Sequence, residues 1–178
     1  STATFNVVLS NPTSEAITLN YQTAENTASA GLAAIGGDYL DTSGSLTFAA
    51  GETSKSFTVT INGDTTVEDF ETFFANLTLA SGSVQIPDPQ AIGTIQNDDI
   101  ALIDIDNPSV IETTGVNTTV SFTVGLTQLN AFDVTVDVRT VDGIVPPAAI
   151  GGSDFIALPA TTVTIPAGSL TVTQDVTI

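Results

Sequence analysis

Short runs of alternating hydrophobic and polar residues cover most of the chain. They are rich in Val, Ile, Thr and Phe, and clusters of Gly, Pro, Asn, Asp and Ser separate them. Alternation at period two is typical of half-buried β-strands, and no stretch keeps a helical period for three turns. The sequence therefore predicts an all-β protein, an antiparallel sandwich or barrel. Strands are expected at residues 3–10, 16–23, 44–50, 55–61, 72–80, 91–96, 120–126, 134–140, 161–168 and 170–178.

The second half of the chain repeats the pattern of the first. Phe5 aligns with Phe122, and Ile61 aligns with Ile178 at the same offset. A period of this length predicts an array of domains rather than a short-period solenoid. We expect a first domain over residues 1–99 that lacks its first strand. The second domain, over residues 100–178, is expected to be incomplete and to stop before its acidic loop. We therefore expect the sequence to be part of a longer protein.

Charge limits the classes of partner. The chain has 178 residues, 42% of them hydrophobic, with 2 Lys and Arg against 20 Asp and Glu and a formal net charge of −18. Nucleic acids and anionic membranes are bound through Lys and Arg, so neither is an expected partner. The abundance of apolar and β-branched residues predicts a folded chain rather than a disordered acidic one. The sequence contains no run of about 18 apolar residues, so it predicts no membrane-spanning helix.

The chain lacks the residue types on which most catalytic sites depend. The chain has no Cys and no His, which excludes disulfides, thiolate chemistry and a Ser-His-Asp triad. No phosphate-binding loop or dinucleotide-binding glycine fingerprint is present. Residues 41–44 spell Asp-Thr-Ser-Gly, as in aspartic proteases, but the second copy supplies no partner aspartate, and the stretch is interpreted as a turn. We therefore expect a protein that is not an enzyme.

One acidic loop needs an explanation. Asp64, Glu68, Asp69 and Glu71 follow a predicted strand within eight residues. Each pair of carboxylates about 4 Å apart costs on the order of 4 kcal/mol at an effective dielectric of about 20. Either the groups spread into solvent, their pKa values rise, or a cation lies among them. Ca²⁺ takes six to eight oxygen ligands from carboxylates, carbonyls and water, and so suits such a loop. A solvated acidic surface loop remains the alternative.

Four motifs together resemble the Calx-beta domain family. They are the Gly-Gly-Asp-Tyr step at 36–39, the Gly-Glu-Thr hairpin at 51–53, the acidic loop at 64–73 and the closing Ile-x-Asn-Asp-Asp at 95–99. The family includes calcium-sensing modules of sodium–calcium exchangers and occurs in large bacterial surface proteins. The resemblance covers nearly the whole chain as about one and two-thirds copies. It implies tandem immunoglobulin-like sandwiches with Ca²⁺ bound in loops at one end.

The resemblance also implies a ligand set. By position it comprises Asp38, Asp64, Thr66 through its backbone carbonyl, Glu68, Glu71, Asp98 and Asp99 in the first copy, and Glu112 and Asp154 in the second. Asp69 falls between these positions and is expected to face water. Asn62 and Asn97 stand where exchanger domains often carry aspartates, so fewer or more weakly bound ions are expected than in a cytosolic sensor.

Three functions are compatible with this reading. The first is a calcium-binding structural or adhesive repeat of a secreted, cell-surface or filament protein, in which Ca²⁺ stiffens the joint between domains. Its partners would be neighbouring repeats, copies associated head to tail, and a cell-surface or matrix ligand. The second is a regulatory Ca²⁺ sensor attached to a transporter or an enzyme. The third is a noncatalytic ligand-binding module of a secreted hydrolase.

Overall fold

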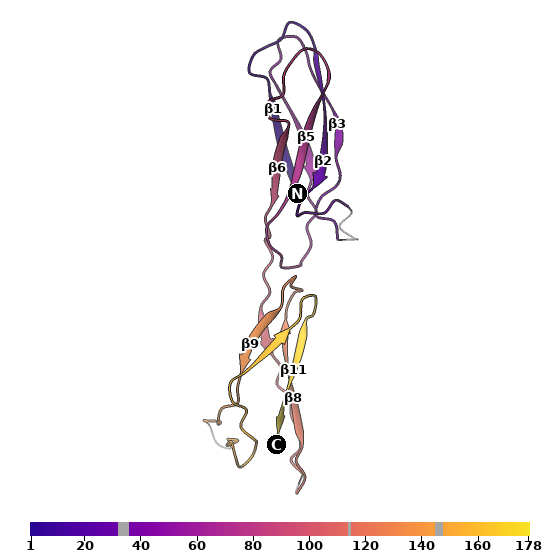
Figure 1. Cartoon of the computed structure of the whole chain (residues 1–178). Coiled ribbons are helices and arrows are strands. Elements are labelled where there is room, and N and C mark those ends of the chain that lie inside the picture. The colour runs from indigo at the N-terminus through magenta and orange to yellow at the C-terminus, as the bar shows by residue number, and fades with distance from the viewer. Residues whose placement is uncertain (32–35, 114, 145–147) are drawn as a thin grey trace. The chain divides into compact units, whose positions relative to one another are not determined.

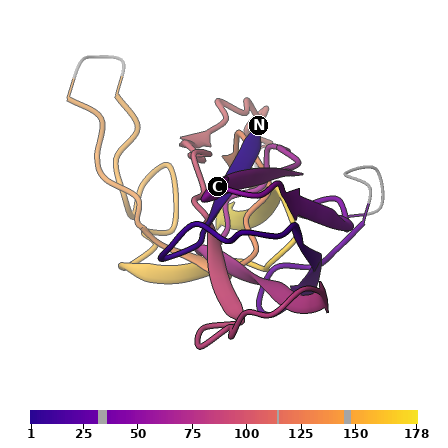
Figure 2. The same ribbon diagram turned by 90° about the horizontal axis from the view of Figure 1, so that it is seen from above.

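The computed structural model describes residues 1–31, 36–113, 115–144 and 148–178. Within these ranges the chain forms strands and loops and no helix, as both views show (Figure 1, Figure 2). This confirms the all-β prediction. It also means that no helix in the described ranges is long and apolar enough to cross a membrane. The strands are β1 Thr2–Val8, β2 Ile17–Glu25, β3 Ser43–Phe48, β4 Ser54–Thr60, β5 Glu71–Ser81, β6 Gln90–Ile95, β7 Ile103–Ile105, β8 Thr119–Leu126, β9 Val134–Val138, β10 Thr161–Ile165 and β11 Thr171–Thr177.

The chain divides into two compact units. Unit 1 comprises residues 1–64 and 69–97, and unit 2 comprises residues 65–68 and 98–178. The domain bounds expected from the sequence, 1–99 and 100–178, stay a prediction. The short segment Thr65–Glu68 groups with unit 2.

Unit 1 is a sandwich of two antiparallel sheets. One sheet pairs β1 with β4, and the other has the order β3-β2-β5-β6. Alternate residues of both sheets are buried in one core, for example Val59 of β4 and Phe48 of β3, both fully buried. Because the two sheets share one core, the sandwich alternative of the sequence prediction is the one that the fold adopts.

Aromatic rings fill the centre of this core. Phe5 and Phe57 stack with ring centroids 5.2 Å apart, and Tyr21 stacks on Phe57 at 4.1 Å. Phe73 meets Phe5 edge-on at 5.8 Å and stacks on Tyr39 at 4.5 Å. Such contacts join β1, β2, β4 and β5 and add to the burial energy of the rings.

Unit 2 repeats two of these pairings among the described residues: β8 pairs with β11 as β1 does with β4, and β9 pairs with β10 as β2 does with β3. Its sheets have the orders β11-β8-β7 and β10-β9. Thr2 pairs with Thr60 in unit 1, and Thr119 pairs with Thr177 at the equivalent place in unit 2. The β2–β3 and β9–β10 registers match in the same way. The internal repeat recognised in the sequence is therefore a repeat of hydrogen-bond register.

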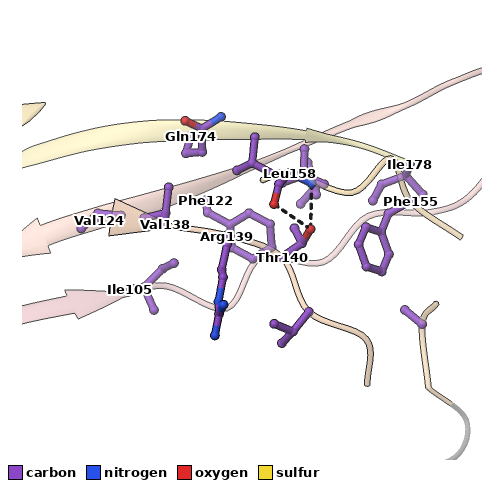
Figure 3. Close-up of a pocket in the computed structure, with 14 residues that line it drawn as sticks. Ile105, Phe122, Val124, Val138, Arg139, Thr140, Phe155, Leu158, Gln174 and Ile178 are labelled. Carbon is purple, nitrogen blue, oxygen red and sulfur yellow. Dashed lines mark hydrogen bonds between the residues drawn. The ribbon is translucent and has the colours of Figure 1, made fainter. Parts of the chain in front are cut away.

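A hydroxyl latch recurs in both units. In unit 1, the buried Thr23 accepts a hydrogen bond from the Thr42 N–H at 2.9 Å and donates one to Asp41 Oδ1 at 2.8 Å. In unit 2, Thr140 Oγ1 accepts from the Leu158 N–H at 2.8 Å (Figure 3). The interpretation of the Asp-Thr-Ser-Gly stretch as a turn was wrong, because Ser43 and Gly44 are the first residues of β3 and pair with β2. Asp41 and Thr42 lead into that strand, held beside β2 by Thr23.

Candidate metal centre

The acidic residues near the end of β4 lie on two segments of the chain. Asp38 lies in the connection from β2 to β3, directly before the fully buried Tyr39. Glu68 belongs to the connection from β4 to β5, and Glu71 is the first residue of β5. Tyr39 forms an isolated antiparallel bridge with Ile61 just after β4. That bridge brings the Asp38 segment beside the start of the acidic loop.

Ser29 orients the Asp38 carboxylate. Asp38 Oδ2 accepts hydrogen bonds from the Ser29 N–H at 2.6 Å and from the Ser29 hydroxyl at 2.9 Å. The N–H groups of Thr27 and Ala28 both donate to the Thr72 carbonyl oxygen at 2.9 Å. The loop that holds Asp38 is therefore tied to the residue that follows Glu71.

Asn62 fixes the same segment through its backbone and its side chain. The Asn62 N–H donates to the Asp38 carbonyl oxygen at 2.9 Å. The side-chain amide donates to the carbonyl oxygens of Gly31 at 3.0 Å and Gly37 at 2.6 Å. A carboxylate is an acceptor only and cannot make these two bonds. Asparagine at this position, noted in the sequence as a departure from the family, serves here as a donor that shapes the site.

Three of the predicted ligands converge. Asp38, Glu68 and Glu71 each offer one carboxylate oxygen, and these oxygens lie within 4.8 Å of one another. All three residues are half-buried. Ca²⁺–oxygen distances are about 2.3–2.6 Å, so two oxygens bound to one ion can lie up to about 5 Å apart. The donor set therefore fits the ion that the sequence implied, with carbonyls and water left to complete the shell.

The other predicted acidic ligands of the first copy are not in this close group. Asp64 and Asp98 are exposed and Asp99 is half-buried, and among the described acids the group close enough to share an ion contains none of the three. Thr66 is half-buried, and its backbone carbonyl stays a predicted ligand. Asp69 is exposed, as expected for a residue that faces water.

The predicted ligands of the second copy make local contacts. Asp154 is exposed, and its Oδ2 accepts a hydrogen bond from the Ile150 N–H at 2.8 Å. Glu112 is also exposed. Within the described residues, neither belongs to a group of three acids that could share an ion.

Tyr39 carries a buried hydroxyl beside the acids. The residue is fully buried, and its hydroxyl forms no hydrogen bond with any described residue. Burial raises the pKa of Tyr39 above its ordinary value, and the carboxylates of Asp41, Glu25 and Asp38 raise the pKa further. Tyr39 therefore keeps its proton at neutral pH.

One of the two basic side chains is engaged elsewhere. Lys55 Nζ lies 2.7 Å from Glu52 Oε1, and this contact is the main cause of the lowered pKa of Glu52. Lys55 lies near the start of the seven-residue β4. The acidic loop follows the other end of that strand, roughly 20 Å away. Lys55 therefore does not neutralise the three carboxylates.

Sequence reasoning did not assign Ser29 a role and gave Asn62 only the role of a missing ligand. Their hydrogen bonds to the Asp38 segment join residues brought together by the connection from β2 to β3 and by the Tyr39–Ile61 bridge. A serine nine positions before the aspartate was the one local signal that could have been used.

Comparison with known proteins gives one family. The Calx-beta domain model matches residues 1–99 and 96–178. The crystal structure of the apo-form Calx CBD1 domain is 26% identical, with 55% of this chain and 83% of that chain covered and a TM-score of 0.49. The crystal structure of CBD12 from CALX1.2 is 22% identical in sequence. The match covers 99% of this chain and 69% of that chain, with a TM-score of 0.49. The crystal structure of the calcium binding domain CBD12 of CALX1.1 is 21% identical in sequence. The match covers 98% of this chain and 67% of that chain, with a TM-score of 0.49. A comparison with curated proteins found no match.

Proposed function

The chain belongs to the Calx-beta domain family, and on this basis we propose that it is a pair of calcium-binding structural repeats of a larger extracellular or cell-surface protein. The observation that carries the proposal is the convergence of Asp38, Glu68 and Glu71, whose carboxylate oxygens lie within 4.8 Å of one another. Three such groups repel one another unless a cation lies among them. The role proposed for the chain is noncatalytic.

Calcium would stiffen the acidic end of the first repeat and the joint that follows it. Glu68 lies in the segment Thr65–Glu68, in the connection from β4 to β5. An ion held by Glu68 together with Asp38 and Glu71 would restrict the movement of this segment. The proposed mechanical role depends on that restriction.

Weak affinity suits a structural role. Extracellular calcium modules bind at about 10⁻⁴–10⁻³ M, whereas sensors bind at about 10⁻⁷–10⁻⁵ M. A set of three carboxylates that relies on carbonyls and water for its other ligands is expected in the weaker class. Binding to the folded form alone stabilises it by about 2.7 kcal/mol at 100 times Kd.

Partners and location follow from the same proposal. Two copies in one chain support neighbouring repeats as the first partners. Millimolar calcium is met outside cells, where such an affinity would be useful. A cell-surface or matrix ligand, and head-to-tail association of copies, extend the proposal to adhesion or filament formation.

Thermal unfolding with and without millimolar Ca²⁺ tests the structural role. The expected result is a Tm raised by roughly 2–10 °C, because millimolar Ca²⁺ is about 1 to 10 times the proposed Kd, with little change in the dimensions measured by X-ray scattering. Micromolar affinity with a large change in dimensions would replace the structural role with that of a sensor. Retention of a glycan or peptide after chelation would favour a ligand-binding module. An unchanged Tm at saturating Ca²⁺ would overturn the structural role.

A further inference from the structure

Asn62 is followed by Gly63, the one Asn-Gly pair in the sequence. The asparagine side chain carries an electrophilic carbon, Cγ, and the backbone nitrogen of the next residue is the nucleophile nearest to it along the chain. Glycine favours attack by this nitrogen, because it has no side chain and its backbone turns freely. Gly63 is exposed, and a Cβ there would meet no atom within 4 Å. The nucleophile therefore lies where water and space are available.

The side-chain amide of Asn62 is held by two hydrogen bonds. Its Nδ2 donates to the carbonyl oxygens of Gly31 at 3.0 Å and Gly37 at 2.6 Å. The Asn62 N–H donates to the Asp38 carbonyl oxygen at 2.9 Å, and the residue is half-buried. Because Nδ2 is the atom that leaves when Cγ is attacked, both of its hydrogen bonds must break before the reaction can proceed.

The two acceptors of this amide form a narrow neck, Gly31 and Gly37. A Cβ at Gly37 would lie 2.6 Å from the Cα of Gly31, so the two backbones are in direct contact. The Gly31 N–H donates to the carbonyl oxygen of the fully buried Tyr39 at 2.9 Å. The neck is thus tied to the core of unit 1, and it presents two fixed carbonyl oxygens to the Asn62 amide.

We propose that Asn62 is a deamidation site whose reaction the fold restrains through these two hydrogen bonds. In the first step the Gly63 nitrogen bonds to Cγ of Asn62, the Cγ–Nδ2 bond breaks, and ammonia leaves with the proton of the Gly63 amide. Water then opens the resulting cyclic imide at either carbonyl, which gives aspartate or isoaspartate. The net change consumes one water molecule and releases one ammonia, so it requires no oxidant or reductant.

The restraint predicts the rate in the folded chain. Only molecules in which the Asn62 amide has left its acceptors can react, so the rate follows the population of that open form. Two hydrogen bonds of ordinary net strength lower this population about thirtyfold. The folded chain should therefore deamidate about thirtyfold more slowly than the same residues in an unfolded peptide.

The product cannot remake the bonds that held the asparagine. A carboxylate only accepts hydrogen bonds, so an aspartate at position 62 would direct a negative oxygen at the carbonyl oxygens of Gly31 and Gly37. Gly37 is buried, and its carbonyl would lose a donor. Isoaspartate would also insert an extra carbon atom into the backbone just before the acidic loop. Deamidation therefore loosens the neck, and each molecule that has opened and reacted keeps the change.

The test follows conversion at residue 62 by peptide mapping with mass spectrometry, at neutral pH and with a chelator present. The chelator keeps the result independent of the proposed calcium site. A synthetic peptide of residues 57–68 is the unrestrained reference. The folded chain should convert about thirtyfold more slowly than the peptide, and the chain in urea should convert at the rate of the peptide. In urea, conversion should be concentrated at Asn62, because no other asparagine precedes a glycine.

Two variants separate the restraint from the chemistry. Ser29→Ala removes a hydroxyl that lies 2.9 Å from Asp38 Oδ2 and 3.1 Å from the Gly36 carbonyl oxygen. It should loosen the neck and speed conversion of the folded chain severalfold, with no effect in urea. Gly63→Ala has room for its Cβ, so it should slow conversion in urea and leave the fold unchanged.

The variant Asn62→Asp shows the effect of the product. It should raise the equilibrium constant of unfolding about tenfold or more, as measured in urea. Equal conversion rates in the folded chain and the peptide would overturn the proposal, as would conversion spread evenly over the other asparagines. An Asn62→Asp chain as stable as the unmodified one would overturn it too, since the two hydrogen bonds would then restrain nothing.

Discussion

Tyr39 stacks on Phe73, with ring centroids 4.5 Å apart and ring planes inclined by 21°. Tyr39 directly follows Asp38, and Phe73 lies two residues after Glu71. The stacked rings therefore fix the two backbone segments that carry these carboxylates. In this way the core of unit 1 positions a charged group at the end of the sandwich, with no counter-charge from Lys55.

Replacing Phe73 with alanine should destabilise the protein strongly. Its ring is fully buried and contacts Phe5 and Tyr39. Removing a buried phenylalanine costs about 3–5 kcal/mol of the free energy of unfolding. Phe70 provides a matched control because it is 64% exposed, so Phe70→Ala should change this free energy by about 0.5 kcal/mol or less. Urea unfolding measures both, and equal losses would show that the stack does not organise this end of unit 1.

Replacing Gly93 with alanine should also destabilise unit 1. A Cβ atom at Gly93 would lie 2.5 Å from atoms of the Phe73 ring, which is enclosed on its other sides. Overpacking of this kind costs about 1–3 kcal/mol. At Gly63 a Cβ would meet no atom within 4 Å, so Gly63→Ala is the control and should leave the urea midpoint nearly unchanged. A stable Gly93→Ala variant would mean that the ring can move aside.

Tyr39 should make stability depend on pH in the alkaline range. Its pKa in the folded protein is raised, first by burial and then by Asp41, Glu25 and Asp38. The unfolded tyrosine titrates near pH 10, so the unfolded state loses its proton first. The stability from this residue is therefore complete below about pH 10 and is lost as the pH rises towards the folded pKa.

The variant Tyr39→Phe isolates that contribution. It removes a buried hydroxyl that forms no hydrogen bond with the described residues, so stability near neutral pH should be unchanged or slightly higher. Phe155 already occupies the equivalent position in the second copy. Urea unfolding at several alkaline pH values should show a smaller decline in the variant. The same decline in both proteins would assign the effect to other groups.

Replacing Thr23 with valine should break the latch in unit 1. The substitution keeps the shape but leaves the N–H of the half-buried Thr42 without its acceptor. An unsatisfied donor of this kind costs about 1–3 kcal/mol. Thr18 makes an exposed hydroxyl contact with Thr47, so Thr18→Val should have a much smaller effect on the free energy of unfolding. If the two variants unfold at the same urea concentration, the latch contributes nothing measurable.

Much of the fold could be predicted from the sequence because period-two alternation marks a strand wherever one face is buried. All ten predicted strands are present, within a few residues of their expected ends. The short strand β7 was not predicted, because Ile103, Asp104 and Ile105 give too few alternations to distinguish a strand from a linker.

The site could be predicted only in part. The motif spacing identified Asp38, Glu68 and Glu71, which the fold brings together. Asp64 and Asp98, also predicted, are exposed and lie outside that group, so their role as ligands stays a prediction. Spacing in a loop does not determine the path of the backbone. The hydrogen bonds from Asn62 to Gly31 and Gly37 join segments far apart in the sequence, so no local sequence pattern predicts them.

Calorimetric titration with Ca²⁺ tests the central proposal most directly. The comparison is between the unmodified chain, the triple variant Asp38→Asn/Glu68→Gln/Glu71→Gln and the control Asp69→Asn, which changes an exposed acid in the same loop. The proposal predicts the same binding heat for the unmodified chain and the control, and none for the triple variant in millimolar calcium. Equal binding by the triple variant, or no binding by the unmodified chain, would contradict it.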